Sequence, residues 1–158
     1  MSLSRKIAAA LDELEGRDLP ATAEVADGSH TLSLEVAAAA PVGLEAAGLT
    51  FRAPGPDRSL AELRAWGERV ASRVTYLMEP LRVHEADEAG VEVALRSVQP
   101  TSRPGRRSFF EARLSREGTL RLGRYAVDEA TGRRGPARFQ LTRETLERLS
   151  DDLAATAR

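Results

Sequence analysis

The chain has no cysteine, a single lysine and few aromatic residues, and each shortage excludes a class of protein. Without cysteine it can form no disulfide, thiolate metal site or iron–sulfur cluster, and it has no cysteine nucleophile. Four Phe, two Tyr and one Trp leave a core built mostly from Leu, Val and Ala. Because Lys6 is the only lysine, the chain also lacks a phosphate-binding loop of the Walker type.

Long apolar runs are missing as well. The N-terminal segment MSLSRKIAAALDELEG begins with basic residues, but acidic residues from Asp12 onward interrupt its short apolar stretch, so it is not a secretory signal. No window approaches the ~18 consecutive apolar residues of a membrane helix. We therefore expect a soluble, cytoplasmic protein without a membrane partner. At 158 residues, 42% hydrophobic and 30% charged, the chain fits one domain over residues 1–158.

The side chains that enzymes and metal sites use are scarce. His30 and His84 are the two histidines; the first alternates with strand leucines, and the second precedes an acidic turn of the kind found in solvent. Adjacent acidic pairs lie at expected turns or on the outside of the last helix, where nothing raises a carboxyl pKa. No serine-hydrolase, zinc-protease or dinucleotide-binding motif occurs. We predict no catalytic residue, no metal site and no cofactor, and favour a protein that is not an enzyme. Missing motifs do not exclude an enzyme, so a small-molecule enzyme with a pocket between helix and sheet stays open as a third class.

The first third of the chain predicts a helix followed by three strands. Residues 3–15 carry apolar side chains on one helical face. The stretch ATAEVADGSHTLSLEV alternates on both sides of Asp27-Gly28, which predicts a hairpin with those two residues at the turn and Val25 opposite His30. The Ala-rich and Gly-rich residues 37–48 show no clear period and are interpreted as a loop, and 49–53 as a third strand.

A central helix is predicted over residues 59–78. Ser59 and Glu62 form a capping box, and the residue before Pro80 ends the run. A wide apolar arc centred on Trp66 can cover a sheet. The opposite side carries a second strip of mostly small residues. The members of this strip are Ala61, Ala65, Ser72 and Tyr76.

The remaining chain predicts an antiparallel meander of four or five strands and a last helix at 142–157, with a bulge at Gly123. The turns between strands are too short for parallel crossovers. We therefore expect an α+β fold in the order α-βββ-α-ββββ(β)-α. A weak duplication of helix plus meander, over 3–53 and 59–141, is compatible with this order.

The element order resembles that of small secretion-chaperone domains, which are dimeric protein-binding modules, and the resemblance rests on order alone. Small residues on the central-helix strip and in the segment 37–48 would let another chain approach closely. The favoured hypothesis is therefore a non-catalytic protein-interaction module that forms a homodimer. The alternative for the strip is that it packs against the first or last helix of the same chain.

The arginines support a second hypothesis. Between Arg96 and Arg143 the chain has 12 arginines against four acids, a net charge of +8, although the whole chain has a formal net charge of −1. The stretch RPGRRSFF supplies Arg103, Arg106, Arg107 and the aromatic Phe109, which could hold nucleic acid or another polyanion by charge and stacking. Cross-strand pairing with acids would instead make this a solvated sheet face, or a contact with a partner protein.

Overall fold

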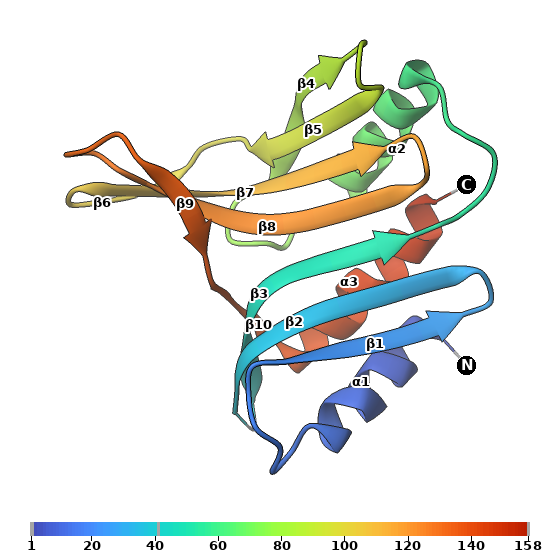
Figure 1. Ribbon diagram of the computed structural model, residues 1–158, viewed down its shortest axis with the longest axis vertical. Coiled ribbons are helices and arrows are strands. Elements are labelled where there is room, and N and C mark those ends of the chain that lie inside the picture. Colours follow the sequence, from blue (N-terminus) through green and yellow to red (C-terminus); the bar gives the residue numbers. More distant parts are fainter. Residues whose placement is uncertain (1, 41, 158) are drawn as a thin grey trace.

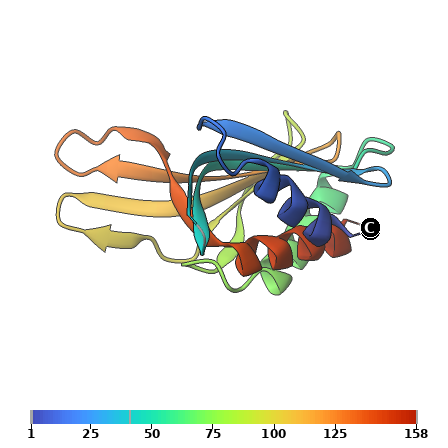
Figure 2. The same cartoon turned by 90° about the horizontal axis from the view of Figure 1, so that it is seen from below.

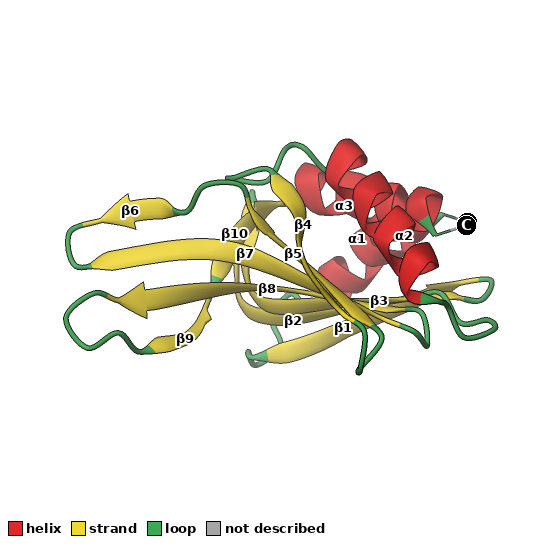
Figure 3. Cartoon of the chain, turned by 90° about the horizontal axis from the view of Figure 1, so that it is seen from above, coloured by secondary structure: helices red, strands yellow, loops and turns green. Residues whose placement is uncertain are grey.

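Three helices cover one face of an antiparallel sheet in the computed structural model, which describes residues 2–40 and 42–157 (Figures 1 and 3). The helices are α1 (Leu3–Glu13), α2 (Leu60–Arg73) and α3 (Arg143–Thr156). The strands of the described part are β1 (Ala21–Asp27), β2 (His30–Ala40), β3 (Gly43–Arg52), β4 (Leu81–Asp87), β5 (Glu92–Ser97), β6 (Thr101–Arg103), β7 (Arg106–Ser115), β8 (Thr119–Asp128), β9 (Arg134–Ala137) and β10 (Phe139–Thr142).

All strand pairs are antiparallel, and the main order is β1-β2-β3-β8-β7-β5-β4. Strand β10 pairs with β3, β6 with β7, and β9 with β8. This confirms the α+β class, the antiparallel pairing, the predicted element order and a single domain. We call the side of the sheet that the helices cover the inner face and the other side the outer face.

The β1–β2 hairpin has a two-residue loop, but one position later than predicted. Asp27 pairs with His30 and Val25 with Leu32, so Gly28 and Ser29 form the loop. Gly28 has φ 61°, which a type II′ turn requires of its first central residue. Each residue of β1 thus pairs with the β2 residue two positions beyond the predicted one, for example Val25 with Leu32 in place of His30. Because the shift is an even number of residues, every side chain keeps the face assigned to it.

The interpretation of residues 37–48 as a loop is wrong. Strand β2 continues to Ala40 and β3 begins at Gly43, with register shifts between Glu35 and Val36 and between Val36 and Ala38. Each shift breaks the two-residue period and bends the ladder. The sequence pattern is lost at the bend, although the strands continue through it.

Helix α2 begins as predicted and ends early. Ser59 Oγ accepts a hydrogen bond from the Glu62 N–H, and Glu62 Oε1 accepts one from the Ser59 N–H, which completes the capping box. The helix ends at Arg73 because Val74 has φ −93° and ψ 81°, outside the helical region. Val74 and Leu77 are nevertheless buried, in a non-helical segment that leads to β4.

The bulge predicted at Gly123 does not form in the β7–β8 ladder. These strands pair without a shift from Arg106 opposite Asp128 to Leu114 opposite Leu120. Arg124 therefore shares the inner face with Leu122, and Tyr125 lies on the outer face. The apolar pattern changed at this point because an arginine occupies an inward position, not because the strand is irregular.

The core lies between the helices and the inner face. Gly67 of α2 packs against Leu95 and Val83, and Phe51 of β3 contacts Trp66 edge to face at 6.5 Å. Trp66 is 1% exposed, and its Nε1–H donates to Thr156 Oγ1 at 3.1 Å, which ties α2 to α3. None of the described helices is both long enough and apolar enough to cross a bilayer.

Candidate interaction surfaces

The strip predicted on the central helix is divided by the end of that helix. Ala61, Ala65 and Ser72 lie exposed on α2, whereas Tyr76 follows the helix and packs against α3. The Tyr76 hydroxyl donates to Asp152 Oδ2 at 2.7 Å, and the Arg148 guanidinium lies 4.0 Å from the ring centroid. Burial, together with the hydrogen bond and charge of Asp152, raises the pKa of Tyr76 above its usual value. The structure thus places Tyr76 in the α2–α3 contact, apart from the three small residues.

The predicted anion-binding residues lie on a projecting arm. The β6–β7 and β8–β9 hairpins extend side by side beyond the helices (Figures 1 and 2), and we call this projection the arm. Arg103 pairs with Arg106 across β6–β7, and Arg106 pairs with Asp128 across β7–β8. Arg107 lies one position further along β7, with its Nε 3.8 Å from Glu129 Oε1. Three of the four predicted residues are therefore exposed near the end of the arm.

Most arginines from Arg96 to Arg143 are matched with carboxylates. Those with an Asp or Glu oxygen within 4.0 Å are Arg96, Arg107, Arg113, Arg116, Arg121, Arg124, Arg134, Arg138 and Arg143. Within residues 2–40 and 42–157, Arg103, Arg106 and Arg133 have no such partner. Between Arg96 and Arg143 the basic charge is thus mostly neutralised, and the unmatched arginines of this stretch lie at the arm.

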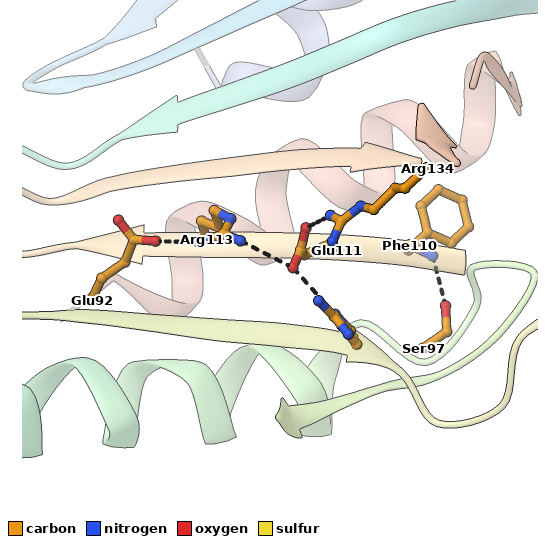
Figure 4. A network of polar contacts seen from close by, with 7 residues as sticks. Glu92, Ser97, Phe110, Glu111, Arg113 and Arg134 are labelled. Carbon is orange, nitrogen blue, oxygen red and sulfur yellow. Dashed lines mark hydrogen bonds and ion pairs between the residues drawn. The ribbon is translucent and has the colours of Figure 1, made fainter. Parts of the chain in front are cut away.

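A buried glutamate holds three of the matched arginines together on the outer face (Figure 4). Glu111 is 2% exposed. Its Oε1 lies 3.2 Å from Arg96 Nε and 3.4 Å from Arg113 Nη2, and its Oε2 accepts a hydrogen bond from Arg134. Arg113 also donates to Glu92 at 2.7 Å, and this hydrogen bond raises the pKa of Arg113. These guanidinium groups cover the carboxylate and are not available as an open anion site.

Phe109 lies on the outer face beside Tyr125, at 6.2 Å between ring centroids. The guanidinium groups of Arg96 and Arg134 each lie 5.3 Å from the Phe109 ring. A nucleic-acid base could stack on this ring only by displacing an arginine that also contacts Glu111. The structure therefore does not bring Phe109 together with Arg103 and Arg106 as an open stacking platform.

The inner face carries a buried ion pair that the sequence reasoning missed. Arg124 Nη2 lies 2.9 Å from Glu79 Oε2, and the side chains are 8% and 7% exposed. Ser97 and Thr101 donate to the same carboxylate. Burial alone would raise the pKa of Glu79, but these hydrogen bonds, that of Arg124 and the charge of Arg124 lower it below 4.5. The sequence hint was an arginine in the inward phase of the β8 leucines.

An apolar groove lies at the end of the β2–β3 hairpin. It has a volume of about 620 Å³. Its main apolar lining comprises Ala38, Ala39, Ala40, Val42, Met78 and Leu141. Val42 is 82% exposed and Met78 72% exposed, so two large apolar side chains that line the same groove are open to solvent. Among the described lining residues Glu45 is the only charged one, and it lies 3.6 Å from Arg138.

The same hairpin has an open strand edge. Strand β1 pairs with β2 only as far as Val36, whereas β3 pairs with β2 as far as Ala40. From Ala37 to Ala40, β2 therefore has a strand partner on one side only, and edges of this kind can pair with another chain. The composition of this segment had suggested close approach, but its interpretation as a loop concealed the edge.

In the described part of the chain, no group of three His, Asp or Glu side chains could hold a metal ion. His30 is half-buried with its ring 5.5 Å from that of Phe51, and His84 is exposed.

Comparison of the chain with known protein families, curated proteins and solved structures gives no match.

Proposed function

We propose that the protein is a non-catalytic, cytoplasmic interaction module that forms a homodimer, and that the two copies meet at the β2–β3 end. The observation that carries this proposal is the open β2 edge from Ala37 to Ala40 beside the exposed side chains of Val42 and Met78. The backbone groups of this edge and the two apolar side chains are exposed to water, and a second chain would cover them. Exposed apolar patches on soluble domains commonly mark interaction sites.

The geometry of the edge favours a second copy as the partner. A two-fold axis brings a strand edge against its own copy in antiparallel orientation, so the same residues contribute on both sides. The sequence from Val36 to Leu44, VAAAAPVGL, contains no charge, so the patch can meet itself without repulsion between like charges. Alanine side chains allow the two backbones to approach to the spacing of neighbouring strands, ~4.8 Å. The small secretion-chaperone domains, whose element order this chain resembles, are dimeric as well.

Sedimentation equilibrium at about 100 µM protein tests the proposal, because an obligate interface is occupied at that concentration. We expect a dimer for the wild type and a monomer for V42E/M78E, which places like charges at the centre of the contact. The matched control is A61E/A65E, which adds two glutamates to exposed positions of α2 and should remain dimeric. A monomeric wild type would overturn the homodimer. A monomeric control beside a dimeric V42E/M78E would move the interface to the helix strip.

A further inference from the structure

We propose that the tip of the arm binds the phosphate backbone of a nucleic acid through Arg103, Arg106 and Arg133. All three side chains are exposed, and within the described ranges none lies within 4.0 Å of a carboxylate. This sets them apart from the other arginines between residues 96 and 143, each of which has an acidic partner. The proposal concerns a different surface from the β2–β3 end and does not depend on the homodimer.

The pairing of the strands places like charges together. Arg103 and Arg106 are directly opposite across β6–β7, so their side chains project from the same side of the ladder. Like charges directly opposite each other destabilise a strand pair. A phosphate between the two guanidinium groups would replace this repulsion with charge-assisted hydrogen bonds, for which the planar arginine fork is well shaped.

Hydrogen bonds of the backbone connect the turns at the tip of the arm. The Glu129 N–H donates to the Gly105 carbonyl at 2.9 Å and joins the two hairpins, and the Asp128 N–H donates to the Arg133 carbonyl at 2.9 Å. Asp128 Oδ1 accepts hydrogen bonds from the N–H groups of Ala130, at 2.8 Å, and Thr131, at 3.3 Å. The carboxylate of the residue opposite Arg106 therefore accepts hydrogen bonds within its own turn, and these backbone contacts connect the two turns that carry the arginines.

The surroundings favour a nucleic acid over an acidic protein. Val42, Met78 and Val98 are the exposed large apolar side chains of the described residues, and none lies at the tip. A stable protein contact needs an apolar centre, whereas a phosphate backbone is held by charge and hydrogen bonds alone. Because the Phe109 ring already contacts Arg96 and Arg134, the site offers no open surface for a base. We therefore expect binding without sequence preference.

Fluorescence anisotropy with a labelled 20-base-pair DNA duplex at pH 7 tests this site. Three arginine–phosphate contacts predict a slope of about −2.7 in log K against log salt, so raising the salt from about 50 to about 150 mM should weaken binding about 20-fold. R103Q/R106Q/R133Q should lose this binding. The control R52Q/R64Q/R82Q removes the same charge from three exposed arginines that have no ion pair among the described residues and lie on other elements, and it should bind like the wild type.

Three results would overturn the proposal. The first is no binding by the wild type at about 50 mM salt. The second is an equal loss of binding in the two triple variants, which would attribute the effect to net charge alone. The third is displacement of the duplex by polyglutamate at a concentration of charged groups no higher than that of the DNA phosphates, which would assign the tip to acidic protein segments.

Discussion

Arg124 buries a guanidinium among apolar side chains, and its ion pair with Glu79 offsets the cost of burying that charge. The guanidinium lies 4.6 Å from the Phe110 ring and 2.9 Å from the Glu79 carboxylate, on the inner face of the sheet. Removing one partner of a buried ion pair leaves the other charge uncompensated, which costs about 3 to 5 kcal/mol. We expect E79Q to lower the free energy of unfolding in urea by about 3 kcal/mol. E79Q/R124M should recover part of that loss, and a loss below about 1 kcal/mol in E79Q would show that water screens the pair.

The pH dependence of stability gives a second measurement on the same residue. The pKa of Glu79 is lower in the folded chain than its ordinary value of 4.5, so the folded state favours the ionised form. Its contribution to stability is complete above about pH 4.5 and is lost as the pH falls through the lowered pKa. The difference in unfolding free energy between wild type and E79Q should therefore shrink as the pH is lowered below 4.5. A constant difference down to about pH 3 would contradict this assignment.

At the scale of elements, the sequence predicted most strands and helices because a repeating apolar period reports which side is buried. It failed where the period is interrupted for a physical reason. The bend in β2 hid the residues up to Ala40, and the inward Arg124 was mistaken for a bulge at Gly123. The candidate sites depend on side-chain partners across strands, such as Glu111 with Arg134, and local spacing carries no information on those.

The sequence predicted the N-terminus of helix α2 correctly. Ser59 accepts a hydrogen bond from the Glu62 N–H at 3.1 Å, which satisfies a backbone donor that the first turn leaves without a partner. We expect S59A to lower the free energy of unfolding by about 1 kcal/mol. S72A, at an exposed position near the end of the same helix, should change it by less than about 0.5 kcal/mol. Equal effects of the two substitutions would show that the cap contributes nothing.

For the whole molecule, α3 connects the two parts of the chain that the sequence suggested as a duplication. Its Arg143 donates to Asp12 of α1 at 2.7 Å, and its Thr156 accepts from Trp66 of α2. The sheet is also continuous across the two parts, because β3 pairs with β8 from Leu49 to Arg52. Neither half therefore closes its own core, and the fold should lose both together.

We accordingly expect one cooperative transition in urea at a fixed protein concentration. Trp66 is the only tryptophan and is buried, so its fluorescence reports on the core, while far-UV circular dichroism reports on all the helices. The two midpoints should coincide. T156V should lower both together, by about 1 to 3 kcal/mol, because it leaves the buried Trp66 N–H without an acceptor. Separate midpoints, or a shift in fluorescence alone, would mean that the halves fold as independent units and that α3 merely rests on them.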